Sequence, residues 1–222
     1  MPLECTNVLW SDLEQGAALY DPQQHSSQIL LGQDLGVSCL SYAAFTLWFL
    51  GYSDQALKKV YEALTLAQKL SHPFSLAYAL YYTAGIHQFR REWQAAQERA
   101  ETSITLSIEQ GFALYSAAGT ILWGWVLAEQ GQGGEGIAQI RQGLAGCRAT
   151  GEEMAQPFGL ALLAEAYGKT GQAEEGLSVL AEALAIVDKT GERFYEAELY
   201  RLKGELVLQS GVRNSQHSTP NT

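Results

Sequence analysis

A helical hairpin that recurs at a constant interval is the strongest restriction on the fold of this chain. The clearest copy runs from Gly151 to Lys189. Apolar residues at helical spacing form two stripes in it, Leu160, Leu163, Ala164 and Tyr167 before Gly171, and Leu177, Leu180, Ala183 and Leu184 after it. One pair of helices cannot bury both stripes, so the hairpin requires copies of itself on either side.

The copies keep one register along the chain, with a constant period of 40. Turns inside the hairpins begin at Gly51, Arg91, Gly131 and Gly171, and turns between hairpins fall at Ser71, Gly111, Gly151 and Gly191. Small residues recur at Ala44, Ala84, Gly124, Ala164 and Gly204 in the first helices, and at Ala56, Ala96, Gly136 and Gly176 in the second helices. Small side chains let two helices approach closely. The spacing therefore predicts an all-α fold, a right-handed α-solenoid of antiparallel helix hairpins.

The same register predicts how the chain is divided. Residues 1–20 look like the second helix of a half-hairpin, and 21–34 form a connection because Asp21-Pro22 ends a helix. Complete hairpins are predicted at 35–70, 74–110, 113–150 and 154–189, followed by a final helix at 193–210. Residues 211–222 are polar and lack an apolar period, which predicts a disordered tail. Both ends of this stack are uncapped, so we expect them to meet another domain or a second copy.

Composition excludes several classes of partner. The net charge is -10, from 14 basic and 24 acidic side chains, which repels nucleic acid and anionic lipid. Apolar runs end well before the roughly 20 residues that a membrane span needs. The odd set of Cys5, Cys39 and Cys147 has no paired spacing, and no signal segment is present, so we expect reduced thiols in the cytoplasm.

Residue patterns that would indicate catalysis are weak. Gly168-Lys169-Thr170 resembles the end of a phosphate-binding loop, but that loop needs glycine where Leu163 stands, and the triplet closes a helix. His87 falls in a core register and has no companion at metal-ligand spacing. Glu165 and Glu205 could imitate a carboxylate pair, although carboxylates on exposed helix faces are ordinary. We expect no catalytic residues, no cofactor and no metal, and a protein that is not an enzyme.

The sequence resembles known protein families at two levels. The pattern of Leu160, Leu163-Ala164, Tyr167, Gly176, Leu180 and Ala183 resembles the tetratricopeptide consensus, with a period of 40 instead of 34 and with Asp188 near the place of the closing proline. The stretches Tyr20 to His25, Gly32 to Tyr52 and Gly191 to Gly211 resemble the C-terminal tetratricopeptide-like region of bacterial signalling ATPases, including those with an N-terminal class III adenylate/guanylate cyclase domain. This resemblance covers nearly the whole chain and implies a sensor or interaction arm.

In tetratricopeptide stacks the first helices line a concave groove, and aromatic side chains recur on that face here. Aromatic residues offer a large contact area at low entropic cost. We expect a partner-binding groove formed by Phe45, Trp48, Tyr78, Tyr81, Phe89, Trp125, Phe158 and Glu165. The alternative is that several of these rings pack between hairpins.

Three functions are compatible with these observations. The first is a non-catalytic interaction or scaffold module that binds a protein or peptide segment in a bacterial signalling system. The alternative is a regulatory arm that senses a small ligand and biases an upstream ATPase or nucleotide cyclase. A free-standing enzyme ranks last, because no residue matches the catalytic domains of those proteins.

Overall fold

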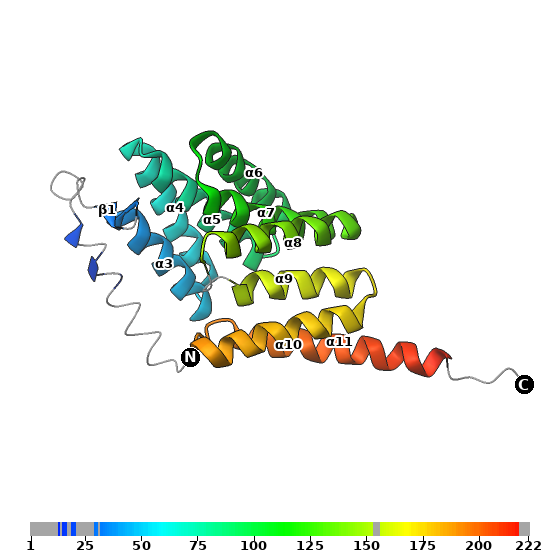
Figure 1. Cartoon of the computed structure of the whole chain (residues 1–222). Coiled ribbons are helices and arrows are strands. Elements are labelled where there is room, and N and C mark those ends of the chain that lie inside the picture. The colour runs from blue at the N-terminus through cyan, green and yellow to red at the C-terminus, as the bar shows by residue number, and fades with distance from the viewer. Residues whose placement is uncertain are drawn as a thin grey trace, which may run out of the picture. The chain divides into compact units, whose positions relative to one another are not determined.

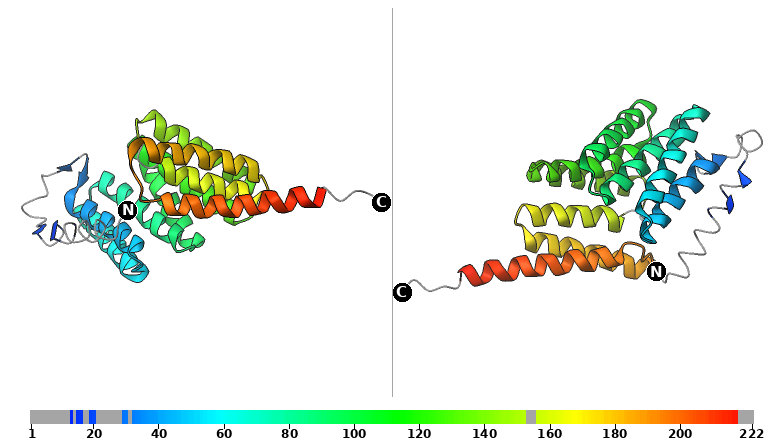
Figure 2. Two further views of the ribbon diagram at one scale, coloured as in Figure 1. Left: turned by 90° about the horizontal axis from the view of Figure 1, so that it is seen from below. Right: turned by 180° about the vertical axis from the view of Figure 1, so that it is seen from behind.

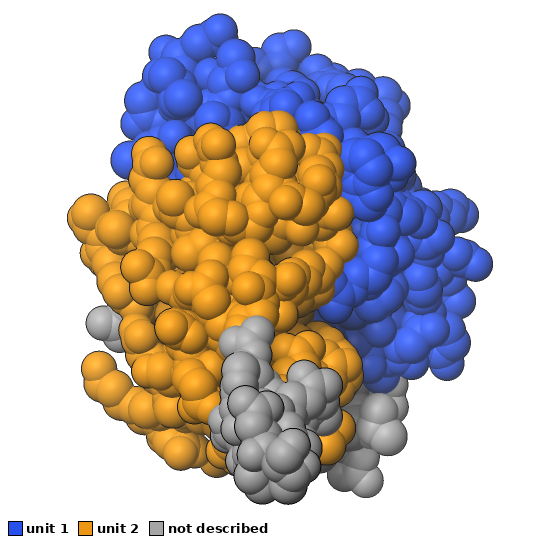
Figure 3. All heavy atoms as spheres, turned by 90° about the vertical axis from the view of Figure 1, so that its right-hand side faces the viewer, with its two compact units in different colours: residues 1–122 blue, residues 123–222 orange. Residues whose placement is uncertain are grey.

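The computed structural model describes residues 13, 15, 16, 19, 20, 29, 30, 32–152 and 156–217, with the side chains of residues 29, 30 and 212–217 excepted. Contacts divide the chain into two compact units, Met1–Leu122 (unit 1) and Trp123–Thr222 (unit 2), which are coloured separately in Figure 3. The boundary falls inside helix α7 (Ala113–Glu129).

Helices joined by short turns make up most of the described part of both units (Figure 1). Before α7 come α3 (Leu35–Phe49), α4 (Ser53–Leu70), α5 (Pro73–Phe89) and α6 (Trp93–Gln110). After α7 come α8 (Gly133–Ala149), α9 (Gln156–Lys169), α10 (Ala173–Thr190) and α11 (Glu196–His217). The all-α class predicted from the repeat is therefore confirmed.

The turns show that the sequence repeat is also a structural repeat. Gly51, Arg91, Gly131 and Gly171 all have a left-handed backbone, with φ between 61° and 88°. In each turn the amide of the following residue donates to the carbonyl five residues earlier, as Tyr52 does to Leu47 at 2.8 Å and Gln172 to Tyr167 at 2.9 Å. This bond closes the first helix and reverses the chain. The four equivalent positions thus share one geometry.

Small residues mark where the two helices of a hairpin cross. Ala44, Ala84 and Ala164 are fully buried on first helices, as are Ala56 and Ala96 on second helices. Gly124 and Gly136 let their helices approach closely, because a Cβ added to Gly124 would lie 2.7 Å from the Gly136 carbonyl oxygen. Larger residues would force these helices apart.

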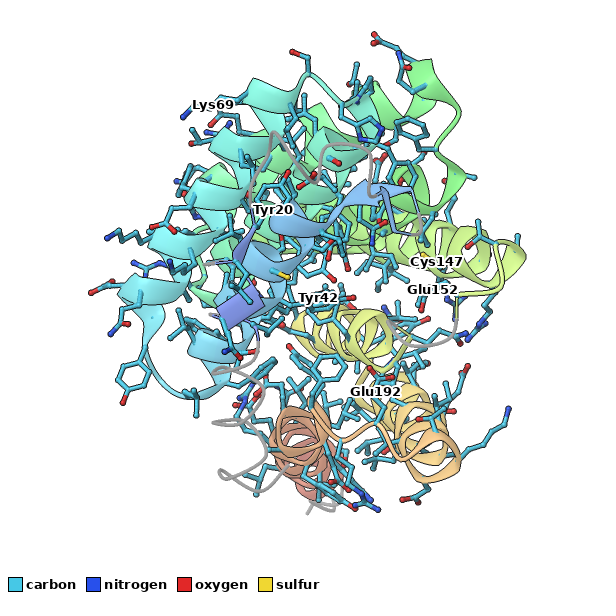
Figure 4. The ribbon with its side chains drawn as sticks, turned by 90° about the vertical axis from the view of Figure 1, so that its left-hand side faces the viewer. Tyr20, Tyr42, Lys69, Cys147, Glu152 and Glu192 are labelled. Carbon is cyan, nitrogen blue, oxygen red and sulfur yellow. The ribbon has the colours of Figure 1, made fainter. Side chains whose placement is uncertain are left out.

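A short β-ribbon precedes the first complete hairpin. Strands β1 (Ile29–Leu30) and β2 (Gln33–Asp34) pair antiparallel within the predicted connection. Asp34 then caps α3, because its Oδ1 accepts from the Val37 amide at 3.1 Å. The Tyr20 hydroxyl donates to Asp34 Oδ2 at 2.5 Å, and Figure 4 shows Tyr20 beside the start of α3. Most of the predicted half-hairpin at 1–20 lies outside the described residues.

The C-terminal helix is longer than the sequence predicts. A disordered tail is predicted from residue 211, but α11 continues to His217. Gly211 costs a helix about 1 kcal/mol without ending it, and the first proline beyond it is Pro220. Residues 218–222 of the predicted tail lie outside the described residues.

No helix in the described part of the chain is both long and apolar enough to cross a membrane.

Candidate protein-binding surface

Aromatic side chains of the first helices form one continuous cluster in unit 1, which we call the aromatic cluster. It consists of Tyr42, Phe45, Trp48 and Phe49 from α3, Phe74, Tyr78, Tyr81, Tyr82 and Phe89 from α5, and Phe112 and Tyr115 from the segment leading into and along α7. Its members recur because each first helix presents the same face as the one before it, as in the equivalent pairs Tyr42 and Tyr82 or Phe49 and Phe89.

Phe89 is the centre of one half of the aromatic cluster. Its ring stacks on Trp48 at 5.5 Å between centroids and meets the edges of Phe45 at 5.1 Å and Phe49 at 5.8 Å. Phe45 fits against α5 because Gly85 lies beneath it, where an added Cβ would be 3.0 Å from the Phe45 ring. Offset and edge contacts of this kind each stabilise by about 0.5–1.5 kcal/mol beyond area burial.

Tyr82 is the centre of the other half. Its centroid lies 4.5 Å from that of Tyr78, 4.8 Å from Phe45 and 5.6 Å from Tyr42. Burial, followed by repulsion from neighbouring tyrosines, raises the pKa of Tyr78 and of Tyr82 well above the ordinary value of 10.0. The two hydroxyls therefore stay protonated at physiological pH and can donate hydrogen bonds.

The aromatic cluster contains five of the eight residues predicted for the groove: Phe45, Trp48, Tyr78, Tyr81 and Phe89. Phe45, Trp48 and Tyr81 are half-buried, whereas Tyr78 is only 2% exposed. Tyr42 is absent from the prediction, yet it is 47% exposed and contacts Tyr82 from outside. Tyr42 lies one 40-residue repeat before Tyr82, and this equivalence is the sequence signal that would have placed Tyr42 in the aromatic cluster.

Trp125 and Phe158 belong to unit 2 and lie in its interior. Trp125 is 1% exposed and Phe158 is 6% exposed, with the Phe158 ring 5.3 Å from that of Tyr195. Their burial corrects the expectation that Trp125 and Phe158 line an open groove. The burial of Tyr78 in unit 1 corrects the same expectation for that residue. Helical spacing places a residue on one face of its own helix, but the neighbouring helices decide whether that face is covered.

Glu165, the last predicted groove residue, takes part in a network of alternating charges. Its carboxylate lies 3.7 Å from Lys169 Nζ, which also contacts Glu129 at 2.5 Å. Glu205 instead pairs with Arg201 at 2.5 Å. Each carboxylate thus has a cationic neighbour, which is the arrangement of an ordinary helix surface and not that of two carboxylates sharing a proton. Lys169 is also the lysine of the loop-like triplet, and it ends α9.

The buried side chain of His87, which the sequence placed in a core register without indicating its partners, joins three helices of unit 1. His87 is 4% exposed, and its Nδ1 lies 2.7 Å from Glu92 Oε2 while its Nε2 lies 3.0 Å from the Tyr61 hydroxyl. Because Nδ1 faces a carboxylate, it donates to Glu92, and Nε2 shares a hydrogen bond with the Tyr61 hydroxyl. Arg90 Nε donates to Glu92 Oε1 at 2.8 Å.

Electrostatics around His87 favour a structural role. Burial acts to raise the pKa of Glu92, but hydrogen bonds from His87 and Arg90 outweigh it and lower that pKa. Both ring nitrogens of His87 are engaged, so the ring cross-links α4, α5 and the start of α6. Among the described residues no group of three or more His, Cys, Asp or Glu side chains is placed to hold a metal ion.

Comparison with known proteins agrees with this architecture. One solved structure, a putative kinesin light chain of Podosopora anserina made of nearly identical TPR-like repeats, has a TM-score of 0.50 at 18% identity and covers 83% of this chain and 97% of its own. The fold is tetratricopeptide-like. BtubC (BKLC) from P. vanneervenii has a TM-score of 0.59 at 16% identity, covering 100% of this chain and 95% of its own.

A Rap protein solved in complex with Competence and Sporulation Factor has a TM-score of 0.59 at 14% identity, covering 93% of this chain and 61% of that chain. No protein-family profile matches the sequence. An uncharacterized protein of Rhizobium meliloti (strain 1021) is 26% identical over 206 residues, or 90% of this chain, and the match spans 20% of that protein's length.

Proposed function

We propose that this chain is a non-catalytic interaction module, and that the α3 edge of the aromatic cluster contacts a protein or peptide segment. The observation that carries the proposal is the position of Tyr42, exposed beside the half-buried rings of Phe45 and Trp48. These three residues offer an apolar surface, and the exposed Tyr42 adds a hydroxyl that can donate a hydrogen bond. Such a combination suits a peptide, which presents both apolar side chains and carbonyl acceptors.

The wider setting of the module is also a proposal. The resemblance to C-terminal arms of bacterial signalling ATPases and cyclases favours a role in signal transduction, with upstream ATPase or cyclase domains or a second copy as further partners. Likeness to the Rap protein, which was solved in complex with Competence and Sporulation Factor, supports the binding of a partner by this type of fold. Cys39 and Cys147 are free thiols, as suits a reducing cytoplasm.

Selection from a random peptide display library tests the peptide-binding role. Peptides enriched on the full chain should bind Tyr42→Ala at least about tenfold more weakly, because truncating a central aromatic contact costs more than about 1.4 kcal/mol. Tyr52→Ala is the matched control, since Tyr52 is 53% exposed in the turn after α3 and outside the aromatic cluster. If both variants lose peptide affinity equally, or if neither loses affinity, the peptide does not bind at the α3 surface.

A thermal-shift screen with small metabolites separates the alternative function. A small molecule that binds the folded state of a ligand-sensing arm stabilises that state and raises its melting temperature. If a metabolite raises the melting temperature of the full chain while no peptide is enriched, the sensor function replaces the one proposed.

A further inference from the structure

Among its described side chains, helix α11 packs against α9 and α10 through one face. Leu199, Leu202 and Leu206 on that face are between 0% and 3% exposed. They pack toward α9 and α10, and the two views of Figure 2 show α11 on the outer side of this pair. Leu206 is wedged between the two helices, since its methyl carbons lie 2.8 Å from where a Cβ on Gly168 would stand and 2.7 Å from one on Gly176.

The opposite face of α11 is apolar and exposed. Tyr200 is 56% exposed, Val207 50% and Leu208 72%, and Gly204 lies between them at helical spacing. We call these four residues the α11 outer face. Arg201, at its border, is paired within the helix with Glu198 and Glu205. An exposed apolar strip of this kind is typical of a contact surface.

The repeat shows what covers this face elsewhere. One repeat before Tyr200 and Val207 stand Leu160 and Tyr167, which are 2% and 3% exposed on α9. The earlier equivalent of Val207, Leu127 on α7, is 5% exposed. In α9 the second helix of the same hairpin, α10, runs along that face. The α11 outer face thus repeats a surface that is an interface within the chain.

Gly204 marks the crossing point on that surface. A Cβ added at its equivalent Gly124 would meet the Gly136 carbonyl oxygen at 2.7 Å and Ile140 Cγ1 at 2.7 Å, both on the covering helix α8. A Cβ added at Gly204 would meet nothing within 4 Å among the neighbouring atoms. The close approach that glycine permits at the first site is therefore unused at the second.

We propose that the α11 outer face binds an amphipathic helix that carries a small residue at the crossing point. The covering helices α8 and α10 define the residue pattern of such a partner. A small residue is followed four positions later by an aliphatic residue, and then by a second small residue and a second aliphatic residue. These positions are Gly136, Ile140, Gly143 and Leu144 in α8, and Gly176, Leu180, Ala183 and Leu184 in α10. The partner helix inserts its small residue at Gly204 and packs its aliphatic residues on Tyr200, Val207 and Leu208. This surface is separate from the aromatic cluster, so either can fail without the other.

A synthetic peptide of residues 172–190, which spans α10, is the probe. Titrated into the full chain, the labelled peptide should bind and gain helicity. Gly204→Trp should weaken binding at least about tenfold, because the indole fills the crossing point. Gly134→Trp is the matched control, since a Cβ there also meets nothing within 4 Å. Leu208→Asp, at a 72% exposed position, should repeat the loss without affecting folding.

Other results would overturn the proposal. Equal binding of the peptide to the parent chain and to both α11 variants would show that it docks elsewhere. A peptide with leucine in place of Gly176 should fail to bind, and its retention would exclude a crossing of the kind seen in the hairpins. If sedimentation shows a dimer that Gly204→Trp converts to a monomer, and the peptide does not bind, a second copy occupies this face instead.

Discussion

Single side chains in unit 1 stabilise the junctions between helices through charge as well as packing. His87 is held between Glu92 and Tyr61, and Arg90 links Glu92 to Ser53 and Asp54 at the start of α4. One glutamate thus serves a buried ring and a guanidinium at once. Its protonation should weaken both contacts.

Glu92→Gln should lower the melting temperature at neutral pH, because it removes the charge that His87 and Arg90 bind. The pKa of Glu92 is lowered in the folded state, so its contribution is present above the ordinary value of 4.5 and is lost as pH falls through the folded pKa. We expect a loss of about 1 kcal/mol, modest because the carboxylate is partly solvated. Thermal melts across this pH range measure it. Asp54→Asn, at a 96% exposed side chain, is the control and should change little.

Glu192→Gln should have the opposite effect. Burial, and then repulsion from Glu152, raises the pKa of Glu192 in the turn after α10 (Figure 4 labels both glutamates). The folded state therefore favours the protonated form, and ionisation at neutral pH destabilises it. The glutamine variant should melt higher than the parent at pH 7, and the gain should disappear as pH falls through the raised pKa. A gain that persisted in acid would point to a cause other than charge.

At the scale of helices, small residues decide how closely two elements pack. Gly124 faces backbone atoms of α8, which cannot move aside as a side chain can. Gly204 occupies the same register position in open space. Substitutions at these two glycines therefore measure separately how a small residue affects helix packing and how much backbone entropy glycine loses in a helix.

Gly124→Ala should destabilise the chain by about 1–3 kcal/mol, because the new methyl group overlaps the Gly136 carbonyl. Gly204→Ala should instead stabilise it by about 0.5–1 kcal/mol, since alanine loses less backbone entropy in a helix. Chemical denaturation of the two variants measures the change in the free energy of unfolding and its sign in each case. Stabilisation by both substitutions would mean that α7 and α8 do not cross at Gly124.

At the scale of the molecule, hairpins within a unit contact their neighbours in sequence, as in other repeat arrays; α4 contacts α5, and α8 contacts α9. Stability is then a sum of local terms, and damage in one hairpin should stay near it. Leu206→Ala, which leaves a cavity at a 3% exposed position, should cost about 2–5 kcal/mol. Hydrogen exchange should accelerate in α9 to α11 while α3 to α6 keep their protection. Faster exchange throughout would show that the chain unfolds as one cooperative body.

The candidate surface was only partly predictable. Phe45 and Trp48, which aromatic spacing along first helices groups with Phe89, contact its ring, because residues one repeat apart occupy equivalent places. It did not separate the exposed Tyr42 from the buried Trp125. The contact between His87, Glu92 and Tyr61 joins three helices, and no spacing within one helix encodes such a meeting.

The amino-acid order alone determined the hairpins and their turns, since helical periodicity, left-handed turn positions and small crossing residues are local properties that recur in every hairpin. Tertiary structure decided which faces remain open. Leu160 and Tyr200 share a register position, yet one is covered by α10 and the other is exposed on α11. Burial depends on which helix lies alongside, and that is a property of the assembled layers and not of any single segment.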